Sequence, residues 1–322
     1  MKRTLIIVAS IILTAQLVLP SAHAFPDRPI KLVVSSPAGG PPDIMARLLS
    51  DRVAAVLGQP IVVENRPGGG GGTIGVRSVL SAEPDGHTLL MGSTSSLLIA
   101  PLIYKNAGYT SDTFLPVAGL SESPEVLAIH PSVKASTVAE LVALAKSMPG
   151  KLTYGSAGVG TLPHIEGELL KARTGIDMRH IPYRGGGPAL TGLLGGEIQI
   201  FFSALPQMLP FIRNGQLRGL AVTSEARSAL APEIPTMVES GFDGFVTASI
   251  NFFVAPPATP KAIRQQVSDA VARALASDEV KQAFAKIGAN EKPASPDELA
   301  TYIMRQQKHW SGIVETTKIS LD

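Results

Sequence analysis

The chain has 322 residues, with 28 lysine and arginine residues against 26 aspartate and glutamate residues, and it contains no cysteine. The absence of cysteine excludes disulfide bonds, thiolate catalysis and cysteine-ligated metals. The near balance of charge, with no basic tract, argues against a nucleic-acid partner.

The first 24 residues have the pattern of a secretory signal peptide. Lys2 and Arg3 precede the apolar run Leu5–Leu19, and Ala22, His23 and Ala24 form an A-x-A cleavage site. The apolar run is short for a bilayer span, which makes an uncleaved anchor the weaker alternative. We therefore expect cleavage after Ala24 and a periplasmic mature chain with 26 residues of each sign.

Short apolar runs alternate with helical periods in the first part of the mature chain. Strands are expected at Ile30–Val34, Ile61–Glu64 and Thr88–Gly92, with helices over Ile44–Leu57 and Thr73–Ala82 between them. This order predicts a mainly parallel sheet with helices on its faces.

A second α/β unit fills the middle of the chain. The strands expected there are Glu125–Ile129, Leu152–Gly155, Arg179–Ile181, Ile198–Phe201 and Leu217–Val222. The helices expected between them are Val138–Ser147, Leu162–Arg173, Pro188–Leu194 and Met208–Asn214.

The C-terminal part is expected to contain one strand, Ile250–Val254, and two helices, Lys261–Ser277 and Pro296–Thr316. Helices with no sheet of their own must cover another surface, and the first unit is the nearest candidate. We therefore predict two lobes joined by two crossings of the chain. Lobe 1 comprises residues 25–124 and 250–322, and lobe 2 comprises residues 125–249.

Two glycine-rich loops lead from a predicted strand into a predicted helix. The first loop, residues 35–43, reads SSPAGGPPD, and the second loop, residues 154–164, reads YGSAGVGTLPH. A helix start offers unpaired N–H groups and the positive end of the helix dipole, which suits an anion. Facing loops from two lobes predict an anion site in a cleft, although each loop alone is compatible with an ordinary tight turn.

Segments along nearly the whole mature chain resemble one known family. They include RPIKLVVSSPAGGPPDIMAR, LGQPIVVENRPGGGGGTIG, PDGHTLLMG, IPYRGGGPAL, LRGLAVTSEAR and IPTMVESGFDGF. In this order they are similar to the periplasmic solute-binding proteins of tripartite tricarboxylate transporters, the Bug family. The resemblance implies a two-lobed Venus-flytrap fold of type II and a small carboxylate ligand, with a dicarboxylate or an aromatic acid among the candidates. It also implies delivery to the membrane subunits of a transporter.

The resemblance carries a set of candidate ligand-binding residues onto this sequence. From the first loop these are Ser36, Pro37, Ala38, Gly39, Gly40 and Asp43, and from the second loop Ser156, Ala157, Gly158, Gly160, Thr161 and His164. Wall and flanking positions add Ser93, Ser95, Arg184 and Ser203. No catalytic residue, metal or cofactor is implied, and we expect a monomer.

Several of these positions allow a purely structural role. Asp43 could cap its helix, His164 could be a structural hydrogen-bonding residue, and Arg184 could form an ion pair within its own loop. Ser36 departs from the family, which usually has an aromatic or apolar residue there. Ser203 stands where an aspartate is frequent, and this loss makes a ligand with an ammonium group less suited to the site.

Enzyme functions find little support in the sequence. There is no G-x-S-x-G, H-E-x-x-H or P-loop motif, and the histidines lack metal-ligand spacing. Gly70, Gly72 and Gly75 match G-x-G-x-x-G, but no acidic residue follows the next strand, which argues against a dinucleotide site. A secreted hydrolase and a ligand-sensing module for a signalling partner remain the alternatives to a transport protein.

Overall fold

A computed structural model describes residues 25–287 and 289–321, and the predicted signal peptide lies outside this range. Its strands are β1 (Ile30–Val34), β2 (Ile61–Asn65), β3 (Thr88–Ser93), β4 (Leu115–Ile129), β5 (Thr153–Ser156), β6 (Arg179–Pro182), β7 (Ile200–Ala204), β8 (Arg218–Val222), β9 (Ala248–Ala255) and β10 (Glu291–Ala294). Its helices are α2 (Pro41–Leu57), α3 (Thr73–Leu80), the π-helix η1 (Thr94–Ile99), α4 (Ala100–Ile103), α5 (Val138–Ser147), α6 (Leu162–Thr174), α7 (Gly186–Leu194), α8 (Leu205–Arg213), α9 (Lys261–Leu275), α10 (Asp278–Lys286) and α11 (Pro296–Thr317).

The strands pair in the order β2-β1-β3-β9-β4-β7-β5-β6, with β8 and β10 also pairing with β4. The three N-terminal strands are parallel, as expected from their β-α-β-α-β order. Parallel pairing also joins β5 to both β6 and β7. The carboxyl ends of β1 and β5, where ligands bind in open α/β sheets, lead directly into the first and second loops.

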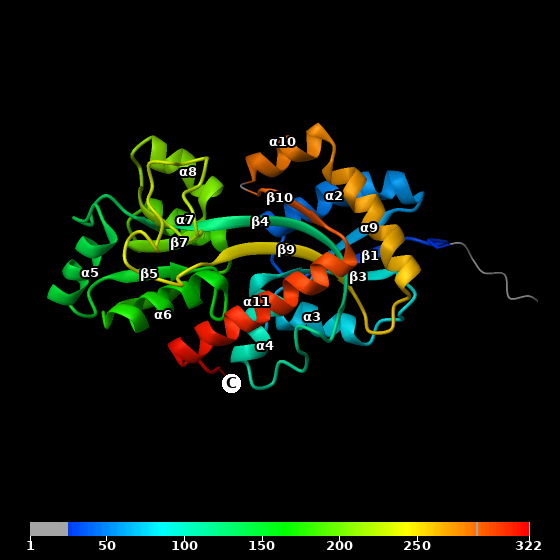
Figure 1. The fold of residues 1–322 in the computed structure, drawn as a ribbon, viewed down its shortest axis with the longest axis horizontal. Helices are drawn as coiled ribbons and strands as arrows, with labels where there is room; N and C mark the ends of the chain where they lie inside the picture. The colour runs from blue at the N-terminus through cyan, green and yellow to red at the C-terminus, as the bar shows by residue number, and fades with distance from the viewer. Residues whose placement is uncertain (1–24, 288, 322) are drawn as a thin grey trace, which may run out of the picture.

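Two long strands carry the chain between the two halves of the molecule (Figure 1). The part of β4 up to Pro124 pairs with β9, and from Glu125 onward β4 pairs with β7 and β8. β9 returns beside β4 from Ala248. The partner strands of β4 change between Pro124 and Glu125, and β9 begins at Ala248, at the same height of the sheet. We therefore propose the boundary between lobe 1 and lobe 2 at these residues, as the sequence pattern predicts.

Three apolar cores lie on the two faces of the sheet. α2 and α9 pack with β1 and the first half of β4 around Leu49, Phe253 and Phe284. α7 and α8 cover a separate core around Phe201. The largest core is shared by η1, α6 and α11, and it contains residues of both proposed lobes, among them Tyr154. The lobes are therefore joined by buried apolar packing on the α6 and α11 side.

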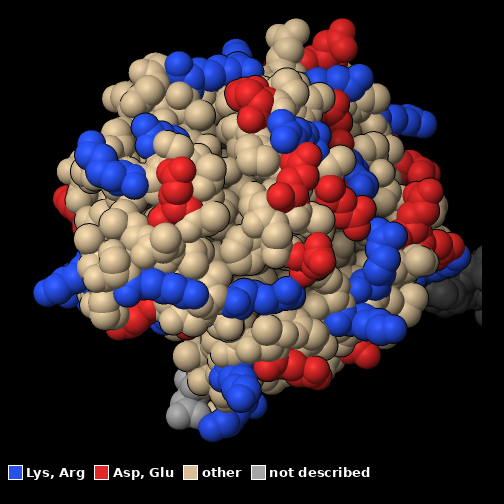
Figure 2. Space-filling view, turned by 60° about the vertical axis from the view of Figure 1, so that its left-hand side comes forward, with Lys and Arg blue, Asp and Glu red and all other residues tan. Residues whose placement is uncertain are grey.

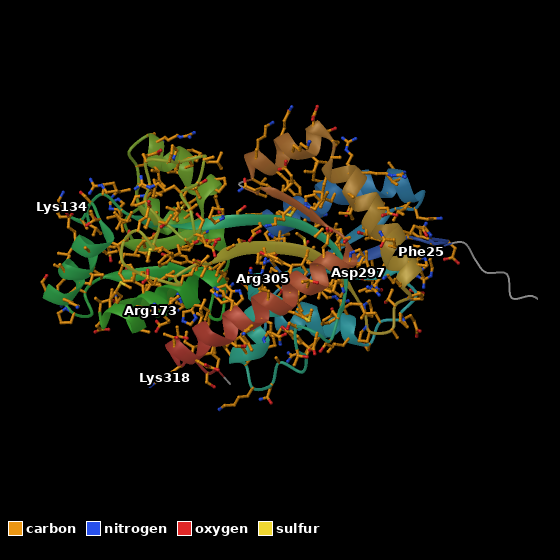
Figure 3. The ribbon with its side chains drawn as sticks, in the orientation of Figure 1. Phe25, Lys134, Arg173, Asp297, Arg305 and Lys318 are labelled. Carbon is orange, nitrogen blue, oxygen red and sulfur yellow. The ribbon has the colours of Figure 1, made fainter. Side chains whose placement is uncertain are left out.

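α11 is the element that covers both halves. Asp297, Arg305 and Lys318 mark its start, middle and end, and it runs from the region of α9 toward α6 (Figure 3). Trp310 near its end is fully buried in the shared core. The adjacent His309 contacts the carbonyl oxygen of Val246 through Nε2 at 2.6 Å. The C-terminal helix thus contacts residues on both sides of the proposed boundary.

The structure corrects the expected C-terminal part and one earlier segment. Three helices follow β9 instead of two, because Ser277 caps a new helix by accepting the N–H of Val280. The segment also has a strand, β10, which pairs antiparallel with the free edge of β4. The stretch after β3, for which no element was expected, forms η1 and α4, and a capping box between Ser93 and Ser96 starts it.

Candidate functional site

The first loop is held in shape by Asp43. The N–H of Gly39, which has a positive φ of 80°, donates to Oδ2 of Asp43 at 2.8 Å, and Oδ1 lies 3.0 Å from the guanidinium of Arg47. Burial disfavours the charged form of Asp43, but the Gly39 N–H, Arg47 and the amide of Asn65 together hold its pKa below its usual value. Asp43 is only 3% exposed. These contacts give Asp43 a structural role in the loop, although not the expected helix cap, because Gly39 precedes the N-cap residue Gly40. A ligand role stays a prediction.

The first loop has hydrogen-bonding groups that the fold does not use. Among the described residues, the N–H groups of Ser36 and Ala38 have no hydrogen-bond acceptor. The hydroxyl of Ser36 is buried and also lacks a partner there. Asn65 fixes the backbone by donating to the Ser36 carbonyl oxygen at 3.2 Å. Unused donors on a fixed backbone are what an anion site needs.

The second loop uses most of its donors internally. Ser156 and Thr161 both donate to the carbonyl oxygen of Gly158, at 3.0 and 2.7 Å, and the Gly158 N–H donates back to Ser156. The Gly160 N–H donates to Nδ1 of His164 at 3.2 Å. These predicted ligand contacts are therefore occupied by the loop itself. The N–H groups that lack an acceptor in the described structure belong to Ala157 and Val159.

Arg184 lies next to the second loop on an exposed stretch of chain. The N–H of its neighbour Gly185 donates to the Ala157 carbonyl oxygen at 3.1 Å, which ties the two segments together. Within residues 25–287 and 289–321, the Arg184 guanidinium has no hydrogen bond or ion pair. The structure thus lacks the loop ion pair considered as an alternative, and the charge is available to a carboxylate.

The run of glycines at residues 68–72 lies between the first and second loops. A methyl group placed on Gly72 would lie 2.7 Å from the carbonyl oxygen of Ser35, in the first loop. One placed on Gly71 would lie 3.2 Å from the carbonyl oxygen of Gly160, in the second loop. The first loop therefore packs against Gly72 and the second loop against the adjacent Gly71. Gly70 and Gly72 of the G-x-G-x-x-G match have positive φ angles, and a methyl group on Gly75 would lie 2.6 Å from the carbonyl oxygen of Arg66.

The structure brings the predicted wall residue Ser95 to the second loop, and Ser93 and Ser203 have hydrogen-bond partners of their own. The Leu162 N–H, at the start of α6, donates to Oγ of Ser95 at 3.0 Å. Ser93 is engaged in the capping box with Ser96. Ser203 bonds to Gln207 on α8 at 3.2 Å, at the carboxyl end of β7, which runs parallel to β5.

One residue at this site was missed in the sequence. Tyr104, just after α4, donates its hydroxyl to the carbonyl oxygen of Val159 at 3.1 Å, and its ring packs against the glycine run. A lone tyrosine in a stretch without an assigned helix carried no signal. Only the fold shows that it contacts the second loop.

Cavities elsewhere contain none of the predicted ligand residues. One of about 290 Å³ lies beside Arg28, Lys31 and Arg66, where ion pairs to Asp85 and Glu64 balance the charge. Another of about 240 Å³ lies between β4, β9, β10 and α11 and includes Asn251 of β9. No group of three or more His, Asp or Glu side chains in the described part of the chain could hold a metal ion.

Comparison with known proteins identifies the fold and the family. Residues 45–319 match the model of the tripartite tricarboxylate transporter family receptor, TctC. The chain belongs to this family. Its fold is the α/β fold of periplasmic binding proteins, and members of the family are non-catalytic solute receptors.

Full-length relatives and solved structures agree with this assignment. Protein BugT of Bordetella pertussis is 36% identical over 324 residues, covering 100% of this chain and 99% of BugT. R. palustris Rpa4515 with adipate has a TM-score of 0.84 at 32% identity, covering 92% of this chain and 99% of that one. MatC of Rhodopseudomonas palustris with bound malate has a TM-score of 0.83 at 31% identity, with coverage of 90% and 100%.

Proposed function

We propose that this TctC-family receptor captures a small dicarboxylate between the first and second loops and delivers it to the membrane subunits of a tripartite transporter. One observation carries the proposal: both strand-to-helix loops present N–H groups that have no acceptor in the described structure. In the first loop they belong to Ser36 and Ala38, and in the second to Ala157 and Val159. Unpaired N–H groups near a helix start stabilise a carboxylate through hydrogen bonds and the helix dipole.

Two separate sets of donors favour a ligand with two carboxylates. The second set includes the free guanidinium of Arg184, which can bind a carboxylate with two parallel hydrogen bonds. The acid nearest to the first set, Asp43, is already neutralised by Arg47, so the loop retains no free negative charge. Adipate and malate, which relatives bind, both carry two carboxylates. Charges of both signs are intermixed over the face drawn in Figure 2. The proposal therefore does not include attraction of the anionic ligand by a large positively charged surface.

Closure of the two lobes is the proposed mechanism of capture. The ligand enters an open form, and the closed form supplies donors from both loops at once. The bond from Leu162 to Ser95, which this structure contains, is one contact between the lobes that we assign to the closed form. The ligand can shift this equilibrium only by its differential affinity for the closed form.

Titration calorimetry and thermal shift on protein refolded from denaturant would test the ligand class. Adipate and malate should raise the melting temperature, because a ligand that binds the folded state stabilises it by mass action. Their diamides should not. A shift given only by sugars, amines or metal ions would show that the proposal is wrong.

Arg184→Gln tests the second set of donors, with Arg273→Gln on the exposed side of α9 as the matched control. Loss of a charged hydrogen bond should weaken dicarboxylate binding by about 1.5–3 kcal/mol, and the control should bind normally. Equal affinity for mono- and dicarboxylates, unaffected by Arg184→Gln, would instead indicate one carboxylate bridged by both loops. Loss of uptake of the identified acid when the gene is deleted would test the transport role against a sensory one.

A further inference from the structure

Two imidazole rings lie face to face beneath the second loop. The ring centroids of His164, from α6, and His180, from β6, are 4.2 Å apart, and the ring planes differ by 28°. Tyr154 of β5 extends the stack on His180 at 4.8 Å. His164 is 7% exposed and Tyr154 is fully buried. The stack therefore forms a rigid support for the loop that carries the free N–H groups of Ala157 and Val159.

A backbone hydrogen bond defines the acceptor nitrogen of His164, and His180 bonds to a hydroxyl of the same loop. The Gly160 N–H donates to Nδ1 of His164, so this nitrogen must be unprotonated and the proton of the neutral ring is on Nε2. Ser156 Oγ lies 3.0 Å from the Gly158 carbonyl oxygen, to which it can donate. Ser156 Oγ also lies 2.6 Å from His180 Nε2, and either a protonated Nε2 or the hydroxyl can be the donor of this bond. Neutral rings satisfy every one of these bonds.

The surroundings favour the neutral rings. Burial is the main effect and lowers the pKa of His164, and burial together with His164 lowers the pKa of His180 to about 4. The carboxylate of Glu168 acts in the opposite direction, but it is paired with Lys171 at 2.8 Å, whose charge again lowers the pKa of both rings. Tyr154 on β5 stays neutral, because burial raises its pKa.

We propose that His164, supported by the stacked ring of His180, is a positioning residue for the second loop and releases the loop when its ring takes up a second proton. The added proton would sit on Nδ1, where it faces the Gly160 N–H, so that two donors oppose each other and the bond is lost. Val159 is the adjacent residue, and its free N–H would lose its fixed direction. Carboxylate capture would then weaken in acid, a step that rests on the proposed function.

The direction of the pH effect follows from linkage. A histidine whose pKa is lower in the formed loop than the ordinary value of 6.5 stabilises the loop fully above that value. The stabilisation is lost as the pH falls below it. Each unit of pKa difference corresponds to at most about a tenfold loss of affinity.

Binding of adipate at about pH 8 and about pH 5 would test the proposal, because the free imidazole changes charge within this range. His164→Asn is the decisive variant, since Oδ1 of asparagine takes the place of Nδ1 as acceptor and cannot be protonated. The carboxyl groups of adipate also take up protons in acid, but they do so equally in the measurements on both proteins, so this effect cancels in the comparison. The loss of affinity in acid should be at least about threefold larger for the unmodified protein than for His164→Asn, which corresponds to about half a pKa unit. Equal losses would overturn the proposal.

A ligand-free measurement separates this proposal from the proposed function. Hydrogen exchange of the Gly160 amide, expressed as a protection factor, should fall at the lower pH in the unmodified protein and stay high in His164→Asn. His164→Phe, which lacks the acceptor, should show low protection at both values. If adipate binds neither the unmodified protein nor any variant, adipate is not the ligand and the proposed function is contradicted for this acid. The exchange data still decide the role of His164. Unchanged Gly160 protection at the lower pH would refute it.

Discussion

The N–H of Leu162, the first residue of α6, donates to the hydroxyl oxygen of Ser95 in η1, 67 positions earlier in the chain, at 3.0 Å. This bond satisfies one of the helix-start N–H groups that would otherwise lack an intrahelical partner. It also joins the two proposed lobes next to the second loop. Ser95 therefore joins two parts of the chain beside the second loop, and its predicted position in the wall of the ligand cleft stays a prediction.

Ser95→Ala should destabilise the closed form, because the Leu162 N–H loses its acceptor. A lost hydrogen bond of this kind costs about 0.5–1.5 kcal/mol, so ligand affinity measured by calorimetry should fall by no more than about tenfold. Ser147→Ala is the matched control, since Ser147 bonds only within its own helix at 2.7 Å. An affinity equal to that of the control would show that this bond does not contribute to capture.

Gly70→Ala should destabilise the fold. Gly70 has a φ of +64°, and a methyl group on it would lie 1.9 Å from the hydroxyl of Tyr104. The left-handed backbone alone costs about 1–2 kcal/mol for other residues, and the clash adds to it. The free energy of unfolding from urea denaturation would measure the loss.

Gly312→Ala is the control for Gly70→Ala and should have the opposite sign. Gly312 lies inside α11, and a methyl group there would meet no other atom within 4 Å. Alanine is favoured over glycine in a helix by about 1 kcal/mol, so the free energy of unfolding should rise slightly. Similar destabilisation of both variants would contradict the packing argument for the glycine run.

Glu166→Gln should flatten the dependence of stability on pH. Glu166 on α6 is fully buried, accepts a hydrogen bond from Thr247, and has one carboxyl oxygen without a partner among the described residues. Burial and the charge of Glu125 raise its pKa well above the usual value, and burial raises the pKa of Glu125 to about 8. A raised carboxyl pKa means that the protonated form stabilises the fold, so stability falls as the pH rises from the unfolded value of 4.5 through the folded one.

Urea denaturation at about pH 5 and about pH 8 would measure this effect, because the raised carboxyl groups titrate in this range. The decrease in unfolding free energy over the interval should be smaller in Glu166→Gln by at least about 1.4 kcal/mol, the equivalent of one pKa unit. Glu315→Gln, at an exposed position of α11, is the control and should follow the unmodified protein. A decrease of the same size in Glu166→Gln and the control would rule out a role for the buried carboxyl pair.

Asp43→Asn should loosen the first loop. Asparagine keeps one oxygen for the Gly39 N–H but loses the ion pair with Arg47. The partner Arg47 is half-exposed, so the loss of stability should be at most about 1 kcal/mol. If Asp43 is structural, as its contacts indicate, affinity for adipate should change by less than about fivefold, which corresponds to about 1 kcal/mol. A complete loss of binding with an unchanged melting temperature would instead assign Asp43 to the ligand.

Periodicity predicted most of the elements because each has one buried face. α2 lies where Met45, Leu49 and Val53 recur at helical spacing, and all three are fully buried. The failures have local causes. The stretch after β3 begins with three hydroxyl residues, Thr94 to Ser96, and continues as an unbroken apolar run, so it gave no period. β10, with the sequence EKPA, is mostly exposed and pairs with the edge of β4.

The candidate site, like the fold, could be predicted from the sequence only in part. Glycine and proline in the first and second loops identified two strand-to-helix turns, since such residues are needed where the backbone is tight or left-handed. The resemblance implied Gly160, Thr161 and His164 as ligand contacts; in the structure their polar groups bond within the loop, and a ligand role stays a prediction. Which donors remain free depends on distances of a few ångströms between residues far apart in the chain. No local pattern contains that information.

The sequence by itself determined the α/β alternation, the two glycine-rich loops and the resemblance to carboxylate receptors, because these follow from residue type and spacing along the chain. Only the tertiary structure decided that Tyr104 and Ser95 contact the second loop, that His164 stacks on His180, and that α11 covers both halves of the molecule. These contacts depend on how the strands pair across β4 and β9, which is a property of the packed sheet as a whole.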